Sequence, residues 1–516
     1  MNKLAYRMTL GTLVACVLSV NVCVIANAGV RRISRAELED KIRGGWAGQM
    51  IGVAYGAPTE FKACGSIGTW ELSWKPDQIE NAIHQDDLYV EMTFSRVMDT
   101  IGLNASSAQY GEAFKNSQYH LWHANAAARR ALNRGINAPM SGHPKYNIHA
   151  NDIDFQIEAD FIGLMCPGLP RAVVFFADRV GRVMNYGDGL YGGMFVGGMY
   201  AAAFFEKDPR RVVEAGLACL PPQSGYAKII KDVLDWSVES PNDWRAVWQK
   251  LEVKWDKDDP CPDGALAPFN IDARLNGAYI AMGLLFGGGD FGKTMEISTR
   301  CGQDSDCNPS SAAGVLGVML GYSGIPEIYK SGIPKLADKK FDFTEYSFND
   351  ICQSTLARAI AVVHRYGGRV TGTEIVIPQQ SPKPPKLEQW NPGIPEKKIT
   401  IRDTAWTWTG QWQSDKDAMV AEGPGNTAIL KFDGVAVAVL GRLTQDGGQA
   451  QVYLDNRKPV LADAYIVDRT HDNALWHVYG LKPGAHTLKI VTTGKADPRS
   501  KGTKVALQGA VIYRAP

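Results

Sequence analysis

The sequence has almost no net charge. Its 55 lysine and arginine residues are balanced by 54 aspartate and glutamate residues, which leaves a formal charge of +1. A chain with this balance has no bulk positive field that could hold nucleic acid. Scattered basic pairs such as Arg31-Arg32 and Arg129-Arg130 are typical of a solvated surface. We therefore expect no nucleic-acid partner.

The N-terminal apolar run is too short for a permanent membrane anchor. It covers residues 10–25 and contains Asn21, whereas a membrane span needs about 20 predominantly apolar residues. Lys3 and Arg7 precede the run, and Ala26-Asn27-Ala28 follows it as a small-x-small cleavage sequence. This pattern predicts a signal peptide over residues 1–28 and export to the periplasm or the extracellular space.

Leu13-Val14-Ala15-Cys16 resembles a lipoprotein cleavage sequence, but the apolar run continues past Cys16, so lipoprotein anchoring is the weaker alternative.

The cysteines follow no zinc-binding spacing. Seven cysteines follow the predicted signal peptide, and an odd number cannot pair completely, so mostly buried thiols are expected. Cys301 and Cys307 could nevertheless form a disulfide bond. The seven are Cys64, Cys166, Cys219, Cys261, Cys301, Cys307 and Cys352.

A phosphate-binding loop is also missing. The glycine-rich segment 192–203 lacks the Gly-Lys-Ser/Thr ending of such loops. Its small residues favour close helix packing instead.

The length of 516 residues suggests two or three domains. Residues 29–375 are predicted to form an all-α domain, because apolar residues recur there at helical spacing and no run of alternating strands interrupts them. Ser34 is a candidate N-cap for the first helix. The segments with the strongest helical pattern are 36–50, 172–183, 226–238, 278–285 and 348–366.

The composition changes near the C-terminus. Residues 376–398 are rich in proline and predict an extended linker. From residue 399 to residue 516, short β-branched or alternating runs separated by Gly, Asp and Asn predict a β-sandwich. This pattern is similar to jelly-roll modules found beside secreted carbohydrate-active enzymes. Trp406 and Trp408 fall on one strand face, where they could stack on sugar, although core packing is the stronger interpretation.

Two carboxylate motifs lie more than two hundred residues apart. Asp86-Asp87 and Asp304-x-Asp306 are both embedded in apolar or small-residue sequence, where an unpaired carboxylate is costly. Each motif alone is typical of a solvated helix start or a turn. Together they predict one pocket in which two divalent cations balance the carboxylates. Oxygen ligands favour Mg²⁺, with Mn²⁺ and Ca²⁺ as alternatives.

These motifs, in their order along residues 37–365, resemble the ADP-ribosylglycohydrolase family. Residues 45–61 resemble the opening helix of the family and its Gly-Ala-Pro-x-Glu-Phe end. Asp86-Asp87 stands in place of Thr-Asp-Asp, and Asp304-Ser305-Asp306-Cys307 stands in place of Asp-Thr-Asp-Thr. The resemblance implies an all-α catalytic domain and metal ligation by Gln85, Asp86, Asp87, Asp304, Asp306 and Cys307.

The sequence departs from the family pattern at several positions. Gln85 and Cys307 replace threonines that help to hold the ions, and a thiol is a poor ligand for Mg²⁺. Val53 stands where the family usually has Asp. The central Gly-Asn-Gly-type loop of the family and its following Met-Arg are not visible, and residues 151–161 occupy their place.

Three further acids are candidate substrate-binding residues. Glu158 and Asp160 lie among apolar residues, a setting that often marks functional sites, although simple helix capping explains the neighbouring Asp152 and Asp154. Asp188 is either a third substrate ligand or a turn residue. His84 beside the acid pair could ligate or orient, but a structural role is the commoner one.

The resemblance implies hydrolysis of a glycosidic bond at the anomeric carbon of an ADP-ribosyl or ribose-like substrate, without a redox cofactor. Glu60 matches the glutamate of the family near the ions, and Glu60 and Asp304 are the predicted catalytic residues. The expected substrate is a small molecule or a glycan, with an ADP-ribosylated protein as a further option. A secreted glycosidase acting on an extracellular glycan and an inactive carbohydrate-binding protein are the alternatives.

Overall fold

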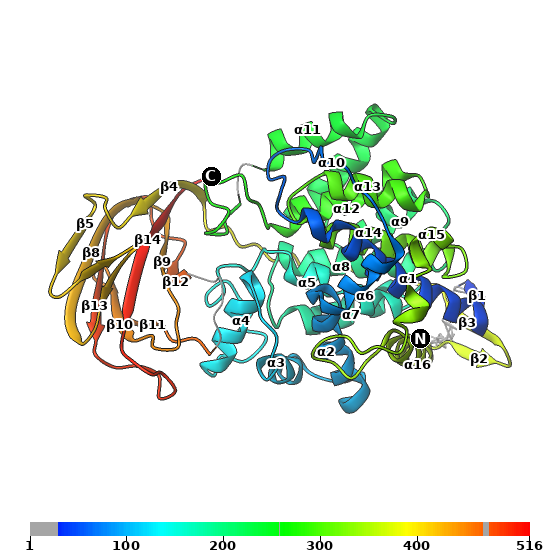
Figure 1. Ribbon diagram of the computed structural model, residues 1–516, viewed down its shortest axis with the longest axis horizontal. Coiled ribbons are helices and arrows are strands. Elements are labelled where there is room, and N and C mark those ends of the chain that lie inside the picture. The colour runs from blue at the N-terminus through cyan, green and yellow to red at the C-terminus, as the bar shows by residue number, and fades with distance from the viewer. Residues whose placement is uncertain (1–28, 257–258, 468–473) are drawn as a thin grey trace, which may run out of the picture.

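The structure is a computed structural model that describes residues 29–256, 259–467 and 474–516. A helical domain covers residues 34–365, and antiparallel sheets lie within residues 369–514. The predicted change from an all-α to an all-β domain is therefore confirmed (Figure 1). The predicted signal peptide lies outside the described residues. None of the helices within the described ranges combines the length and the apolar character that crossing a membrane requires.

Sixteen α-helices occur in the described part of the chain. They are α1 (Arg35–Gly56), α2 (Asp86–Ile101), α3 (Ser107–Lys115), α4 (His123–Asn133), α5 (Asp154–Ile157), α6 (Asp160–Leu164), α7 (Pro170–Gly181), α8 (Asp188–Ala203), α9 (Pro209–Leu217), α10 (Gly225–Glu239), α11 (Trp244–Trp255), α12 (Ala273–Gly287), α13 (Phe291–Arg300), α14 (Cys307–Leu320), α15 (Glu327–Lys330) and α16 (Phe348–Arg365). Short 3-10 helices are η1 (Ala57–Thr59), η2 (Pro76–His84) and η3 (Ile333–Lys335). Ser34 caps α1 as predicted, because its hydroxyl oxygen accepts a hydrogen bond from the Glu37 amide at 3.0 Å.

Helices α1 and α14 pack with their backbones in close contact. Four glycines recur every fourth residue along α1: Gly44, Gly48, Gly52 and Gly56. A Cβ atom on Gly48 would lie 2.2 Å from the carbonyl oxygen of Ala313, and one on Gly56 would lie 2.1 Å from that of Ser305. The contacts run in opposite chain directions, so the helices are antiparallel. The end of α1 therefore meets the beginning of α14.

Glycines also allow close packing in α8, which is buried almost throughout. The close packing predicted for this segment is found where α6 contacts α8. A Cβ atom added to Gly163 of α6 would lie 2.6 Å from the carbonyl oxygen of Gly197 in α8. The segment is a helix interior with no phosphate-loop geometry.

A small antiparallel sheet joins the two ends of the helical domain. It has the order β1 (Val30–Ser34), β3 (Glu374–Pro378) and β2 (Arg369–Thr371). The pairing of β3 with β1 places residues 376–378 in a strand, and the sandwich begins at Ile394. The proline-rich stretch without regular structure is thus 379–393, shorter at both ends than the sequence predicted. It is held on the helical domain, because Glu388 pairs with Arg182 at 2.7 Å.

The C-terminal domain is a sandwich of two antiparallel sheets. Its strands are β4 (Ile394–Thr400), β5 (Trp406–Thr409), β6 (Gln413–Asp415), β7 (Ala418–Ala421), β8 (Pro424–Gly434), β9 (Ala436–Arg442), β10 (Gln449–Leu454), β11 (Val460–Asp463), β12 (Ala474–Val478), β13 (Gly484–Thr493) and β14 (Val505–Arg514). One sheet has the order β11-β10-β13-β8-β5, and the other has the order β12-β9-β14-β7-β6 with β4 added beside β14. Residues such as Leu430 on β8 and Val439 on β9 share one apolar core.

Trp406 and Trp408 stack on each other with ring centroids 5.2 Å apart, and both pack against this core. Trp406 is buried. The core-packing interpretation therefore holds for Trp406, which has no surface left for a sugar.

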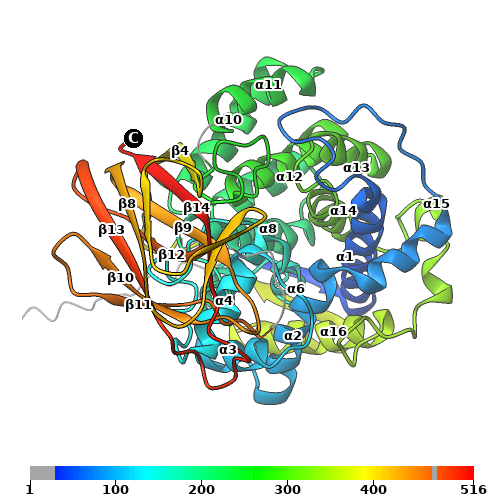
Figure 2. The ribbon, with the colours of Figure 1, turned by 60° about the vertical axis from the view of Figure 1, so that its left-hand side comes forward.

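The two domains share a third apolar cluster. Ile148 and Ala265 of the helical domain pack there with Val511 and Tyr513 of β14. Helix α4 borders the same junction, because Arg130 donates to the carbonyl oxygen of Ala474 at 2.8 Å. Figures 1 and 2 both place α4 beside the strand-rich domain.

Candidate active site

The predicted acids are placed by the ends of three helices. Asp86 and Asp87 are the first residues of α2. Asp304 and Asp306 directly precede α14. Glu60 follows η1, which continues from the end of α1. The N-termini of α2 and α14 stabilise negative charge, because their first amide groups point outward.

Backbone hydrogen bonds hold the Glu60 loop against the Asp304 loop. The Phe61 amide donates to the carbonyl oxygen of Gln303 at 3.0 Å, and the Gln303 amide donates to that of Ala63 at 2.9 Å. Phe61 and Gln303 both have positive φ angles, 51° and 54°. Such backbone costs about 1–3 kcal/mol per residue and persists only where its surroundings impose it. Both strained residues directly adjoin a predicted catalytic acid.

Cys307 connects the two carboxylate motifs. Its thiol donates to Oδ2 of Asp87 at 3.1 Å, and its backbone amide donates to Oδ1 of Asp304 at 3.4 Å. Cys301 and Cys307 are both free thiols, so the disulfide bond that their spacing allowed is not formed.

Glu60 and several of the predicted metal ligands border a cavity of about 700 Å³. Glu60, Gln85, Asp86, Asp304 and Cys307 all contribute to its wall, whereas Asp87 and Asp306 are buried behind it. The rest of the wall is largely aromatic and aliphatic, and it contains two histidines and three further polar groups. It consists of Phe61, His84, Tyr89, Trp122, His123, Asn125, Ile153, Asp154, Ile157, Asp263, Phe269 and Ile271.

Burial and mutual repulsion raise the pKa values of the site acids. Desolvation, followed by the charges of Asp306 and Asp86, raises the pKa of Glu60 to about 8. Desolvation and Asp306 raise the pKa of Asp86 to about 6. The pKa values of Asp87 and Asp304 are also raised, again chiefly by burial. A cation bound in the pocket would lower the pKa values of these carboxyl groups.

The donor set fits hard divalent cations. Oδ1 of Asp87 and Oδ1 of Asp306 are buried and accept no hydrogen bond from any of the described residues. A buried carboxylate oxygen without a donor is costly unless a cation satisfies it. Apart from Cys307, the side chains gathered here offer oxygen ligands, which Mg²⁺ prefers.

The predicted substrate-binding acids do not line this cavity. Asp160 is buried, and its Oδ2 lies 3.5 Å from the Ser311 hydroxyl. Glu158 is also buried and accepts a short hydrogen bond from the Asn125 amide group. Asp188 borders a separate cavity of about 330 Å³, where its Oδ1 accepts from the Tyr226 amide at 3.0 Å.

Asp152 and Asp154, the two acids expected to cap the helix that follows them, contact other parts of the chain. The carboxylate of Asp154 accepts hydrogen bonds from the amides of Ala124 and Asn125 at 3.2 and 3.0 Å, so it caps α4 instead of its own helix. The carboxylate of Asp152 contacts His149 at 2.8 Å.

Sequence reasoning missed most of the cavity wall. Trp122, His123, Asp263 and Phe269 carry no motif and come from two segments far apart in the chain. His123 has a positive φ angle of 41°, a feature that its sequence does not predict. His84 was noted beside the acid pair, and it lines the cavity while its Nδ1 lies 2.8 Å from Oδ2 of Asp342.

Comparison with known proteins gives matches of different extent. A galactosaminidase of Flavonifractor plautii, described as acting on A-type blood alpha-D-galactosamine, is 24% identical over 177 residues, which are 33% of this chain and 16% of that protein. The present chain thus spans only a small part of that relative. Among solved structures, an ADP-ribosylglycohydrolase-related protein complex has a TM-score of 0.41 and 15% identity, covering 63% of this chain and 98% of that one. A two-domain esterase active on acetylated mannans has a TM-score of 0.21 and 13% identity, covering 33% of this chain and 47% of that one.

A family-wide match agrees with the motifs that surround the cavity. The model of the ADP-ribosylglycohydrolase family matches residues 34–363, which include α1, the Asp86-Asp87 pair and α14. This match spans well over half of the sequence and ends within the last helix of the helical domain. The chain belongs to the ADP-ribosylglycohydrolase family.

Proposed function

We propose that the protein is an exported, metal-dependent hydrolase that cleaves a glycosidic bond at the anomeric carbon of an ADP-ribosyl or ribose-like substrate. The supporting observation is the meeting of Glu60 with two carboxylate motifs more than two hundred residues apart at one cavity. The cavity volume, about 700 Å³, lies within the usual range for small-molecule sites.

Asp86, Asp87, Asp304 and Asp306, together with the Gln85 side chain, would hold the ions. Bound Mg²⁺ would supply positive charge that orients sugar hydroxyls and acidifies water. Cys307 is a poor ligand for Mg²⁺, and we assign it the role of holding Asp87 and Asp304 in place through its two hydrogen bonds.

Glu60 is the proposed general base. Its side chain borders the cavity, where a water molecule can reach it, and it directly precedes Phe61, whose amide bonds to the carbonyl oxygen of Gln303 beside Asp304. Its carboxylate takes a proton from the attacking water while the water oxygen forms the bond to the anomeric carbon. The bond to the leaving group breaks, and the leaving group departs with the bonding electrons and takes up a proton from solvent, while Glu60 returns the proton it gained to solvent. Phe61, Tyr89 and Trp122 offer ring faces that could stack on the substrate.

The test compares wild type, Asp304→Asn and Glu60→Gln at one Mg²⁺ concentration. Asp304→Asn should abolish turnover and reduce bound metal, because a neutral amide removes charge next to the ions. Glu60→Gln should lower kcat by about 10²–10⁴-fold without a matching loss of metal. Metal stoichiometry and kcat are measured on the same preparations. An Asp304→Asn variant that keeps both its metal and its activity would falsify the proposal.

The substrate panel should contain ADP-ribosylated protein, ADP-ribosyl small molecules and nitrophenyl furanosides. Hydrolysis of any of these by wild type, with loss in Asp304→Asn, supports the proposed chemistry. Activity that is independent of divalent metal in a chelator-treated preparation would contradict it.

A second candidate is hydrolysis of a neutral or amino-sugar glycan. Five carboxylates border the cavity, and the described residues of its wall include no lysine or arginine. A pyrophosphate group would meet little positive charge there from the protein itself, whereas a sugar amine would be attracted. The partial match to a galactosaminidase points the same way. Nitrophenyl galactosaminides therefore belong in the panel, and a preference for them over every ADP-ribosyl substrate would decide for this candidate. No activity on any substrate, together with no bound metal, would favour an inactive carbohydrate-binding protein.

A further inference from the structure

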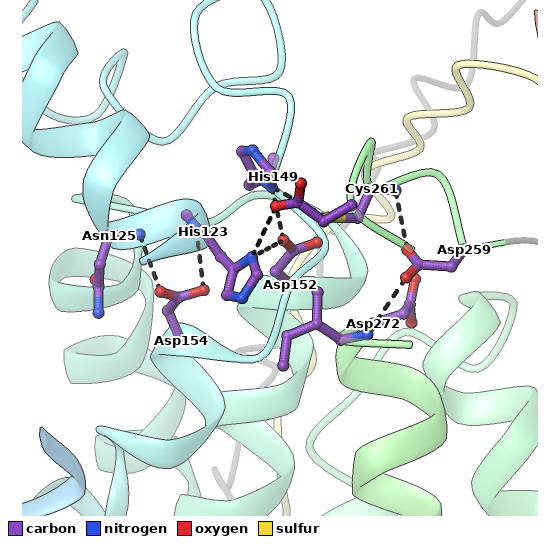
Figure 3. Close-up of polar contacts among 12 residues, drawn as sticks. His123, Asn125, His149, Asp152, Asp154, Asp259, Cys261 and Asp272 are labelled. Carbon is purple, nitrogen blue, oxygen red and sulfur yellow. Dashed lines mark hydrogen bonds and ion pairs between the residues drawn. The ribbon is translucent and has the colours of Figure 1, made fainter. Parts of the chain in front are cut away.

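A second group of metal-ligating side chains lies beside the active-site cavity. His123 begins α4, His149 and Asp152 lie in the connection between α4 and α5, and Cys261 lies in the connection between α11 and α12. One ligand atom from each of these four residues lies within 4.8 Å of all the others. Figure 3 shows the four side chains pointing toward one another. We propose that His123, His149, Asp152 and Cys261 bind one zinc ion.

Two distances within the group fit a tetrahedral site. Zinc bonds of about 2.0–2.3 Å place the ligand atoms of a tetrahedron about 3.3–3.8 Å apart. Sγ of Cys261 lies 3.3 Å from Nδ1 of His149, and Nδ1 of His123 lies 3.7 Å from Oδ2 of Asp152. The pair of His149 Nδ1 and Asp152 Oδ2 is closer, at 2.8 Å, because these atoms share a hydrogen bond that an ion would replace.

The chemical types select zinc over magnesium. Two imidazole nitrogens, one sulfur and one carboxylate oxygen are borderline or soft ligands, whereas Mg²⁺ needs oxygen and water. One thiolate and one carboxylate would neutralise the charge of the ion. His149, Asp152 and Cys261 are buried, and the side chain of His123 is 15% exposed. Four protein ligands in a closed site are typical of structural zinc, without an open position for a reacting water.

Surrounding hydrogen bonds hold the ligands in place. Asp259 accepts from the backbone amide of Cys261 at 2.9 Å and from that of Ile271 at 3.3 Å. Asp154 fixes the start of α4 through the amides of Ala124 and Asn125. The positive φ of His123, 41°, is thereby imposed by its neighbours and turns its ring toward Asp152.

The position of the group gives the ion a role. Residues 259–272 carry Cys261 and also contribute Asp263, Phe269 and Ile271 to the wall of the active-site cavity. The Tyr513 hydroxyl of β14 donates to the carbonyl oxygen of Pro260 at 2.9 Å. Zinc would therefore fasten one segment that both shapes the cavity and contacts the C-terminal domain.

The test measures zinc and magnesium separately in the full chain. Wild type, Cys261→Ala and the control Cys219→Ala are produced with zinc in the medium and desalted. Cys219 is also a buried free thiol, but it packs against α8 and lies outside the group. We expect one zinc per chain in wild type and in Cys219→Ala, and at least a tenfold lower content in Cys261→Ala. Asp304→Asn should keep its zinc, which separates this site from the Mg²⁺ site.

Cobalt substitution gives a second readout that does not depend on how the variants fold. Co²⁺ added to chelator-treated wild type should produce a thiolate-to-cobalt absorption band and intense tetrahedral bands, and Cys219→Ala should show the same spectrum. Wild type that yields neither stoichiometric zinc nor this spectrum would show that the four side chains form only a hydrogen-bonded cluster. Zinc content in a folded Cys261→Ala equal to that of wild type would also overturn the proposal.

Discussion

Protonation of Glu60 and Asp86 couples the stability of the metal-free protein to pH. The pKa of Glu60 is raised from 4.5 to about 8, and that of Asp86 is raised from 3.8 to about 6. The folded state therefore binds more protons than the unfolded state between about pH 4 and pH 8, and its stability falls as the pH rises through this window. The thermal midpoint of the chelator-treated protein should drop by a few degrees between pH 5.5 and pH 8.

Mg²⁺ and an amide variant provide the controls for this pH effect. Asp306→Asn removes one of the charges that raise the pKa of Glu60, so its midpoint should depend less on pH. Mg²⁺ should bind more tightly at pH 8 than at pH 5.5, because it competes with protons for the same carboxylates. A metal-free midpoint that rises steadily over this range in wild type, with equal Mg²⁺ affinity at both pH values by calorimetry, would contradict the argument.

Individual residues differ in how far the sequence could predict their roles. The Ser34 cap is a local pattern, and the structure confirms it. The two carboxylate motifs are also local patterns, but the cavity at which they meet depends on the fold. The carboxylate of Asp154 bonds to amides in the first turn of α4, 29 and 30 residues earlier in the chain, so no local pattern could show it. His149 and Cys261 are 112 residues apart, and their contact depends wholly on the fold.

At the scale of elements, α1 and α14 depend on the absence of side chains between them. A Cβ atom on Gly52 would lie 2.2 Å from the carbonyl oxygen of Pro309. That overlap is with backbone, which cannot rotate away, so the two helices must separate. Gly52→Ala should lower the free energy of unfolding by about 1–3 kcal/mol, the usual cost of overpacking, and should reduce kcat because Asp304 moves away from Glu60.

Gly111→Ala is the matched control. Gly111 lies inside α3, where an added Cβ atom would approach the flexible end of Leu132 at 3.1 Å and the Cβ atom of Ala138 at 3.3 Å, with the nearest backbone atom of Ala138 at 3.8 Å. Better helix propensity offsets this contact by up to about 1 kcal/mol, so stability should change little. Both variants are compared by chemical denaturation and by kcat. Equal effects of the two substitutions would show that the glycine contacts of α1 are unimportant.

Element types were predictable where periodicity was strong, and pairings over long distances were not. The helices near residues 172, 226, 278 and 348 follow apolar spacing in the sequence. The pairing of β1 with β3 joins residues 340 or more positions apart, and it extends the domain beyond its predicted end at residue 375. Backbone pairing of this kind leaves no signal in either short strand alone.

At the scale of the whole molecule, the shared apolar cluster should make the two domains unfold together. Val511 of β14 is fully buried in that cluster, on the face of the sheet that meets Ile148 and Ala265. An aspartate there would be buried without a partner, so the domains should separate while each keeps its own core. Calorimetry of the full chain should show one transition for wild type and two for Val511→Asp.

Val460→Asp makes the same exchange on an exposed edge strand, where Val460 is 52% exposed. This variant should retain the single transition of wild type. Two transitions in wild type, or an unchanged profile in Val511→Asp, would show that the domains are energetically independent despite the contact.

The glycine contacts of α1 with α14 also bear on how this scaffold could be redesigned. The distance between Glu60 and Asp304 is set by peptide backbone, whose dimensions do not vary with the choice of side chain. Trp122, Ile157 and Phe269 line the cavity and lie outside that contact. Libraries at these three positions could therefore vary the shape of the wall for new leaving groups, while the acids keep their spacing.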